Sequence, residues 1–188
     1  LDKSNNLSYS YYGTFSIQGV PMNARKAVTI YEDKKKKTKT IIRNKQLTNN
    51  ERLSSLVKVL GLDYAKTYET QAEVNTLRYG KVIIATDADV DGKGNIFCLI
   101  INFFTLFWPA LVKRKFITRF NTPIIRALPK GKKYVEEFYT LKEYTLWVDA
   151  KYEGSEEKVS KLYNIKYYKG LGSHRKQEIP AMFEDFEK

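Results

Sequence analysis

The hydrophobic pattern in the middle of the chain predicts a strand followed by a long helix. Residues 82–85 form an apolar run rich in β-branched side chains, and polar residues bound it on both sides. A run of this kind is typical of a strand buried on both faces. Residues 95–111 are strongly apolar over a helical length, and Pro109 predicts a break near their end.

The pattern before this strand predicts smaller elements. Residues 13–19 alternate apolar and polar side chains and end in glycine, which predicts a strand closed by a turn. A short helix is expected after Pro21. Leucines and valines at helical spacing predict a helix over residues 47–61, capped by Thr48 or Asn49 and stopped by its final glycine.

After the long helix, strands and helices continue to alternate, which favours the α/β class. The pattern predicts, in order, strands within residues 116–127 and at 136–139, a helix over 141–148, a charged connector over 151–158, a strand at 165–168 and a C-terminal helix over 178–188.

Composition limits the class of protein. The chain has 188 residues, 43% of them hydrophobic and 14% aromatic, which suits one large domain or one domain with an appendage. No apolar run reaches the roughly 20 residues of a membrane span, and no signal peptide is visible. Because the sequence opens on Leu1 and not on Met, we expect a part of something longer.

The net charge of +12 predicts a polyanionic partner, with nucleic acid ahead of an anionic membrane. The alternative is a soluble surface that is merely basic. Residues 34–37 are four consecutive lysines, expected as an exposed loop or hairpin tip, or alternatively as a DNA-backbone contact or localisation signal.

The single cysteine and the single histidine limit the kinds of site that the chain can form. Cys98 alone excludes an internal disulfide and a cysteine-rich zinc site, and its apolar surroundings predict a core position. His174 follows a glycine-rich segment and is expected to be a solvated loop residue.

Three acids follow the central strand at alternate positions: Asp87, Asp89 and Asp91. Ligands of α/β sheets bind at the carboxyl ends of strands. Alternate side chains of an extended chain share a face, so Asp87 and Asp89 can converge. Because neighbouring carboxylates repel, a divalent cation is expected there, and Mg²⁺ suits one or two carboxylates with water and phosphate.

Two other interpretations of these acids compete with a metal site. Most Asp-x-Asp pairs are solvated loop acids, so the pair alone is weak evidence. The pattern also opens like an EF-hand loop, which needs a bidentate Glu at its twelfth position. That position is Cys98, and the segment before Asp87 is predicted to be a strand and not a helix, so the EF-hand is disfavoured.

Several segments, in this order, resemble the TOPRIM region of type IIA DNA topoisomerases, closer to eukaryotic and large DNA virus enzymes than to bacterial gyrase. Together they cover most of residues 13–180. The segments are 77–81 leading into 87–92, 108–111 followed by 120–125, and 167–172, with weaker matches at Gly19 plus 23–27 and at 60–64.

The resemblance implies a TOPRIM (Rossmann-like) fold, with a parallel sheet flanked by helices and a small α+β insertion. The expected domains are a TOPRIM core over 1–127, an insertion over 128–163, and the Lys-Gly-Leu-Gly strand-loop with the start of a helix over 164–188. It also implies Mg²⁺-dependent cleavage of double-stranded DNA, strand passage and religation by a homodimer. ATP would be used by another domain, and the location would be intracellular, at DNA in the nucleus or at a viral replication site.

By the same resemblance, Asp87 and Asp89 are metal ligands with catalytic roles, and Asp91 is a further metal-site residue. Lys169 is implied as a catalytic or DNA-contacting residue. The implied DNA-backbone contacts are Arg25, Lys26, Lys93, Lys169, Gly170 and Gly172, although Lys93 could equally be solvated.

The chain also departs from the family pattern. The family's Glu-Gly-Asp-Ser-type motif is absent and is expected upstream of Leu1, and the nucleophilic tyrosine is expected in another part of the enzyme. The 188 residues alone are therefore expected to be inactive. The rival hypotheses are another TOPRIM enzyme such as a primase or OLD-type nuclease, a non-catalytic basic DNA-binding module, and a phosphatase-like acid cluster.

Overall fold

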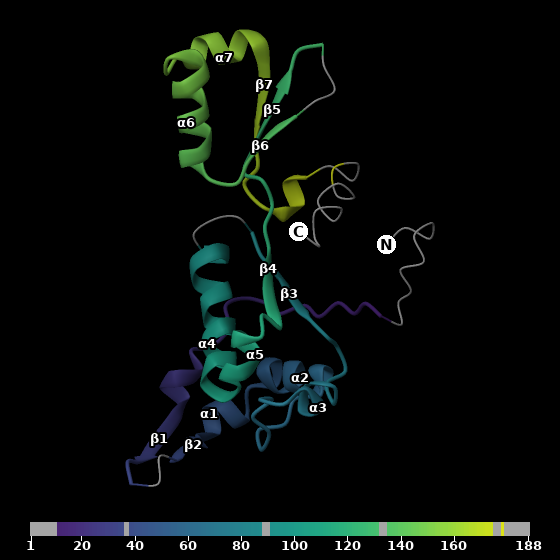
Figure 1. The fold of residues 1–188 in the computed structure, drawn as a ribbon, viewed down its shortest axis with the longest axis vertical. Helices are drawn as coiled ribbons and strands as arrows, with labels where there is room; N and C mark the ends of the chain where they lie inside the picture. The colour runs from purple at the N-terminus through teal and green to yellow at the C-terminus, as the bar shows by residue number, and fades with distance from the viewer. Residues whose placement is uncertain (1–10, 36–37, 88–90, 132–134, 175–177, 179–188) are drawn as a thin grey trace. The chain divides into compact units, whose positions relative to one another are not determined.

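The computed structural model describes residues 11–35, 38–87, 91–131, 135–174 and 178. The chain divides into two compact units (Figure 1). The first unit comprises residues 1–84 and 95–118, and the second comprises residues 85–94 and 119–188. None of the described helices has the length and apolar character that a membrane span needs.

The predicted α/β class is confirmed. Strand β3 (Val82–Ala85) pairs with β4 (Ile117–Phe120) in a parallel sheet, and two helices lie between them in the sequence. The Val82 N–H donates to the Phe116 carbonyl at 2.8 Å. The expectation that β3 is buried on both faces is wrong, because Ile83 is 40% exposed while Ile84 is buried. Among the described residues, β4 is the only strand paired with β3.

The first unit is mainly helical. Its other elements are the 3-10 turn η2 (Ala24–Ala27), strands β1 (Val28–Asp33) and β2 (Thr38–Arg43), and helices α1 (Lys45–Thr48), α2 (Glu51–Leu60), α3 (Gln71–Val74), α4 (Phe97–Phe107) and α5 (Pro109–Lys113). Strands β1 and β2 form an antiparallel hairpin. Residues 13–19, predicted to form a strand, have no ladder partner in the described part of the chain.

The predicted helix over 47–61 is two helices, and its predicted caps are wrong. Asn44 caps α1 and Asn50 caps α2, each through a side-chain oxygen that accepts a backbone N–H three residues later at 3.0 Å. Thr48 instead donates its hydroxyl to the Lys45 carbonyl within α1. Gly61 ends α2 with φ +72°, as the glycine stop predicts.

Trp108 organises the core of the first unit. It is fully buried, and it interrupts the apolar stretch predicted as one helix: α4 ends at Phe107 and α5 begins at Pro109. Its ring contacts Phe103, Phe104 and Tyr64 at centroid distances of 5.0 to 5.8 Å. The indole N–H donates to the Asp63 carbonyl at 2.9 Å, so this buried donor is satisfied.

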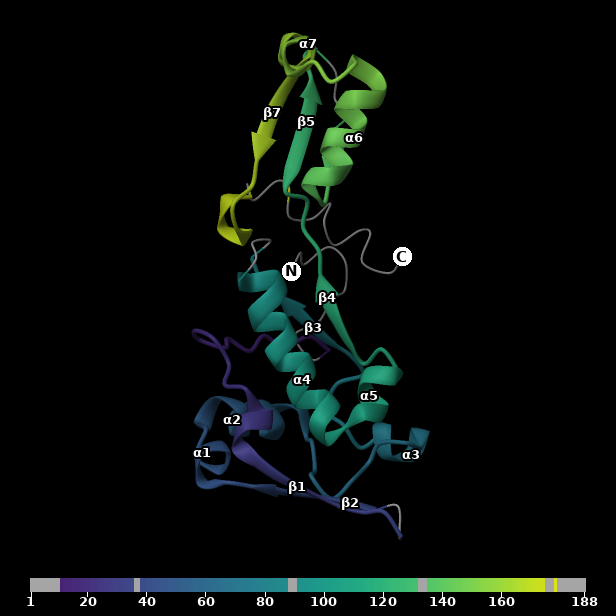
Figure 2. The ribbon, with the colours of Figure 1, turned by 90° about the vertical axis from the view of Figure 1, so that its left-hand side faces the viewer.

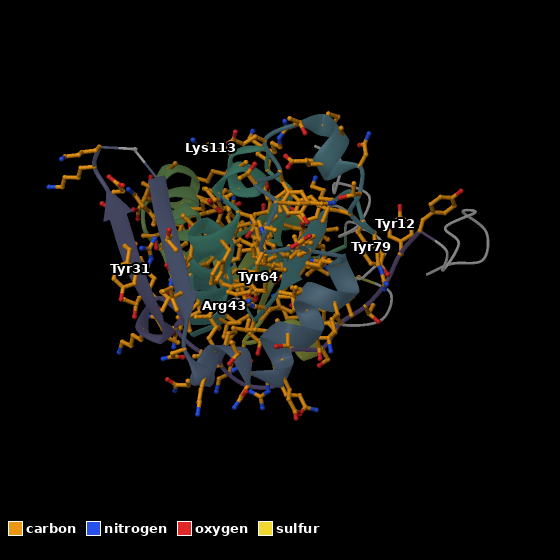
Figure 3. The ribbon with its side chains drawn as sticks, turned by 90° about the horizontal axis from the view of Figure 1, so that it is seen from below. Tyr12, Tyr31, Arg43, Tyr64, Tyr79 and Lys113 are labelled. Atoms are coloured by element: carbon orange, nitrogen blue, oxygen red, sulfur yellow. The ribbon has the colours of Figure 1, made fainter. Side chains whose placement is uncertain are left out.

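Tyr64 connects this core to the hairpin. The Arg43 guanidinium at the end of β2 lies 3.8 Å from the centroid of the Tyr64 ring, the geometry of a cation–π contact. Figure 3 shows the two side chains next to one another. The hairpin is therefore attached to the core at its base.

Cys98 was predicted to lie in the core, and this is wrong: it is exposed on α4. The core-facing positions of α4 are Ile100, Phe103, Phe104 and Leu106. Because the helix is apolar nearly all round, the sequence pattern does not mark which face is buried.

The second unit contains an antiparallel sheet in the order β6-β5-β7, with β5 (Ile125–Pro129), β6 (Glu136–Phe138) and β7 (Tyr163–Tyr167). Helices α6 (Leu141–Tyr152) and α7 (Glu156–Leu162) join β6 to β7. Figure 2 shows α6 lying alongside β5 and β7. The shared core consists of Ile125, Ala127, Phe138, Tyr144, Val148 and Val159.

The charged connector predicted over 151–158 is wrong. Helix α6 continues to Tyr152, and Ser155 caps α7 by accepting from the Lys158 N–H. The charged residues form exposed helical faces, while Val159 is fully buried. The C-terminal helix predicted over 178–188 falls outside the described residues apart from Glu178.

Gly61→Ala should destabilise the chain by about 1–2 kcal/mol, because a non-glycine residue in the left-handed region carries that steric cost. The new Cβ would also stand 3.3 Å from the Arg78 Cγ. Thermal unfolding measures the effect. Gly80→Ala is the matched control, since no described atom lies within 4 Å of its Cβ position. Equal melting temperatures for the two variants would contradict the assignment of Gly61 as a strained helix stop.

Candidate functional site

The Lys-Gly-Leu-Gly segment forms a tight loop directly after β7. The Ser173 N–H donates to the Gly170 carbonyl at 3.0 Å, and the Gly170 N–H donates to the Ser173 hydroxyl at 3.4 Å. Residues Leu171–Ser173 form a short 3-10 turn, η4. The loop is therefore closed by its own hydrogen bonds, and it leaves the Lys169 side chain exposed.

The Asp87 carboxylate lies against this loop, at Gly170. A Cβ built on Gly170 would stand 2.9 Å from Asp87 Oδ1 and 3.0 Å from Asp87 Cγ. Real side chains do not approach this closely, so only glycine admits the carboxylate here. Gly172 has no described atom within 4 Å of the corresponding position. The structure thus brings together one acid and one loop residue that the sequence separates by more than 80 positions.

The other predicted metal residues are only partly described. Asp89 lies outside the described residues. Asp91 and Lys93 belong to the π-helical turn Asp91–Ile96 before α4, and their side chains lie outside the description. Within the described part of the chain, no three acidic, histidine or cysteine side chains are grouped as metal ligands.

The loop begins and ends on a pair of stacked rings. Tyr168 and His174 lie parallel, with centroids 4.1 Å apart and an interplanar angle of 11°. The Tyr168 hydroxyl donates to Glu178 Oε1 at 2.9 Å. The expectation that His174 is solvated is wrong, because its side chain is only 2% exposed. Burial lowers the pKa of His174, and the neighbouring Arg126 guanidinium lowers it further, against an opposing effect of Glu178.

A cluster of balanced charges lies beside these rings. Arg126, whose side chain is 7% exposed, forms an ion pair with Glu137, which faces it on β6. Lys166 faces Arg126 from β7. Glu178 lies 3.6 Å from Arg126 and 3.4 Å from Lys166. Two cations and two carboxylates therefore share one face of the sheet.

Sequence reasoning missed this cluster. The available signal was the strand alternation, which puts Arg126 on the face opposite Ile125 and Ala127. That signal does not reveal the register that places Glu137 and Lys166 across from Arg126, because register depends on the pairing of strands distant in sequence.

Arg25 and Lys26 are described in the first unit, and both are exposed. The Arg25 Nε donates to Asn102 Oδ1 on α4 at 2.6 Å. The Asn102 amide in turn donates to Asn23, the residue that caps η2. This relay fixes the direction of the Arg25 guanidinium, whereas no hydrogen bond or ion pair to another described residue orients the Lys26 side chain.

The chain is similar to several known proteins. Residues 120–188 match the family model described as the C-terminal associated domain of TOPRIM. The DNA topoisomerase 2 of African swine fever virus, strain Badajoz 1971 Vero-adapted, is 41% identical over 191 residues, which cover all of this chain and 15% of the viral protein. DNA topoisomerase 2 top-2 of Caenorhabditis elegans is 38% identical, over 93% of this chain and 10% of its own length.

A solved structure of a topoisomerase II is also similar to this chain. The DNA-binding, cleavage and re-ligation domain of Plasmodium falciparum topoisomerase II superposes with a TM-score of 0.63 at 34% identity, over 76% of this chain and 18% of that one. The chain thus spans about a sixth or less of the relatives it matches. It belongs to the type II DNA topoisomerase family, as a segment that carries the TOPRIM region.

Proposed function

We propose that this segment is the Mg²⁺-binding TOPRIM module of a type II DNA topoisomerase. It would support ATP-dependent cleavage of both DNA strands, passage of a second duplex and religation. The observation that carries the proposal is the placement of the Asp87 carboxylate against Gly170, within a chain that aligns over its whole length with viral DNA topoisomerase 2.

The donor set fits Mg²⁺. Asp87 offers an exposed carboxylate at the end of β3, and Asp89 and Asp91 follow it at alternate positions in the sequence. Magnesium is bound through one or two carboxylates and keeps its other positions for water and phosphate. Asp87 and Asp89 would hold the ion, with Asp91 as a further metal-site residue. When bound, the ion would stabilise negative charge on phosphoryl and leaving oxygens.

The Lys-Gly-Leu-Gly loop would present DNA phosphate to this site. Lys169 carries an exposed cation one residue before the glycine that touches Asp87. Gly170 and Gly172 leave the loop backbone uncovered by side chains, so a phosphate can approach it closely. Lys169 therefore acts in binding or in charge stabilisation at the phosphate.

Further DNA contacts would be electrostatic. Arg25 is held in place by Asn102, and Lys26 and Lys93 supply additional cations along the chain. Contacts to the DNA backbone carry little sequence information and weaken as salt rises. The partners would be double-stranded DNA, the remaining domains of the enzyme and a second copy of it, at an intracellular DNA site. The ATP site would lie in another domain.

Replacing Asp87 and Asp89 together by Asn should abolish Mg²⁺ binding, because the substitutions remove the two charged oxygen ligands. Isothermal titration of Mg²⁺ into the 188-residue chain measures this loss. Asp63→Asn is a matched control, since Asp63 lies in the first unit, away from the acids after β3 in the sequence. Identical Mg²⁺ binding by the double variant and the parent chain would leave only a non-catalytic basic module.

Gly170→Ala should lower DNA cleavage by the full-length enzyme about tenfold to a hundredfold, since a displacement near 1 Å at a catalytic site has effects of that size. The added Cβ cannot coexist with the present position of the Asp87 carboxylate. Gly80→Ala, which lies in the first unit and meets no described atom, should change cleavage much less. The measurement is the yield of linear DNA from a supercoiled plasmid, and an effect at Gly80 as large as that at Gly170 would contradict the proposal.

A further inference from the structure

The two ends of the Lys169–Ser173 loop are held by one ring stack. Tyr168 immediately precedes the loop and His174 immediately follows it. The two rings stack in parallel, so the two ends of the loop lie close together. Tyr168 is buried and is anchored to Glu178 through its hydroxyl at 2.9 Å. The position of the His174 ring therefore determines where the second end of the loop lies.

The His174 ring is held by packing and not by hydrogen bonds. Within the described part of the chain, neither ring nitrogen has a hydrogen-bond partner, although the side chain is only 2% exposed. The nearest carboxylate oxygen, Glu178 Oε2, is 4.0 Å from Nδ1, too long for a hydrogen bond. A buried ring without partners is tolerated far better neutral than charged.

The charges around His174 reinforce this preference. Arg126 on β5 and Lys166 on β7 face it as cations, and Glu137 on β6 and Glu178 face it as carboxylates. The two pairs balance, so a protonated His174 would add a third positive charge to a buried cluster. The pKa of His174 is lowered, first by burial and then by Arg126, and Glu178 only partly offsets these effects.

We propose that His174 is a positioning residue for the Lys169–Ser173 loop: its neutral ring, stacked on Tyr168, keeps Gly170 beside Asp87, and its protonation releases the loop. The inference rests on the proposed function, because the loop matters only if it serves DNA cleavage. The pH direction follows from the lowered pKa. The neutral stack is fully formed above the ordinary histidine pKa of 6.5 and is lost as pH falls through the lower pKa of the folded state.

The test compares plasmid relaxation by the full-length enzyme that carries this segment across the range from about pH 8 to about pH 5, which brackets an ordinary histidine. The wild-type rate should fall about tenfold per pH unit once His174 begins to protonate. His174→Phe keeps an aromatic ring for the stack but cannot be protonated. It should retain the neutral-pH rate and lose this acid step. Tyr168→Phe keeps both rings and the histidine, so it should retain the step.

His174→Ala removes the stack itself and should lower the rate at every pH. If this variant fails to fold, the pH profile of His174→Phe still decides the matter. An acid step in His174→Phe equal to that of the wild type would overturn the inference, as would full neutral activity in His174→Ala. A wild-type enzyme that does not relax DNA at all would instead refute the proposed function.

Discussion

The close approach of the Asp87 carboxylate to Gly170 is the constraint on which the candidate site depends. A carboxylate at the end of a strand is ordinarily solvated, and here Asp87 Oδ1 lies 2.9 Å from the position that a Cβ on Gly170 would occupy, in a loop from the other end of the sequence. The contact is possible only because position 170 has no side chain. It defines a place where a cation bound by Asp87 and a phosphate held by the loop would meet.

Both hydrophobic and electrostatic interactions hold this loop in place. The sheet of the second unit buries Ile125, Ala127 and Phe138 against α6 and α7 on one face. On the other face, Arg126 is buried with enough carboxylate partners to neutralise it and Lys166. Removing one member of such a cluster leaves an uncompensated charge, so the cluster favours a single loop arrangement. The His174 ring is buried beside this cluster, and burial lowers its pKa.

The first unit supplies a different kind of support. Its core is a group of aromatic rings around Trp108, whose indole nitrogen is satisfied by a backbone carbonyl. From this core α4 presents Asn102, which orients Arg25 through a direct hydrogen bond. A hydrogen bond from a side chain on α4 thus fixes the direction of an exposed cation.

The sequence by itself determined the elements with strong local signals and the identity of the family. The β-branched run of β3, the glycine that ends α2 and the capped helix α6 follow from local backbone preferences. The ordered motifs around Asp87, Trp108 and Lys169 identified the family because many residues had to agree at once. The roles of Asp87, Asp89 and Lys169 remain predictions.

Only the tertiary structure decided which faces are buried and which distant residues meet. The exposure of Cys98 and the burial of His174 depend on packing partners that neighbouring positions do not encode. The contact between Asp87 and Gly170 and the register of Arg126 with Glu137 likewise join distant segments. Local sequence fixes backbone preference, whereas burial and electrostatic neutralisation are properties of the assembled fold.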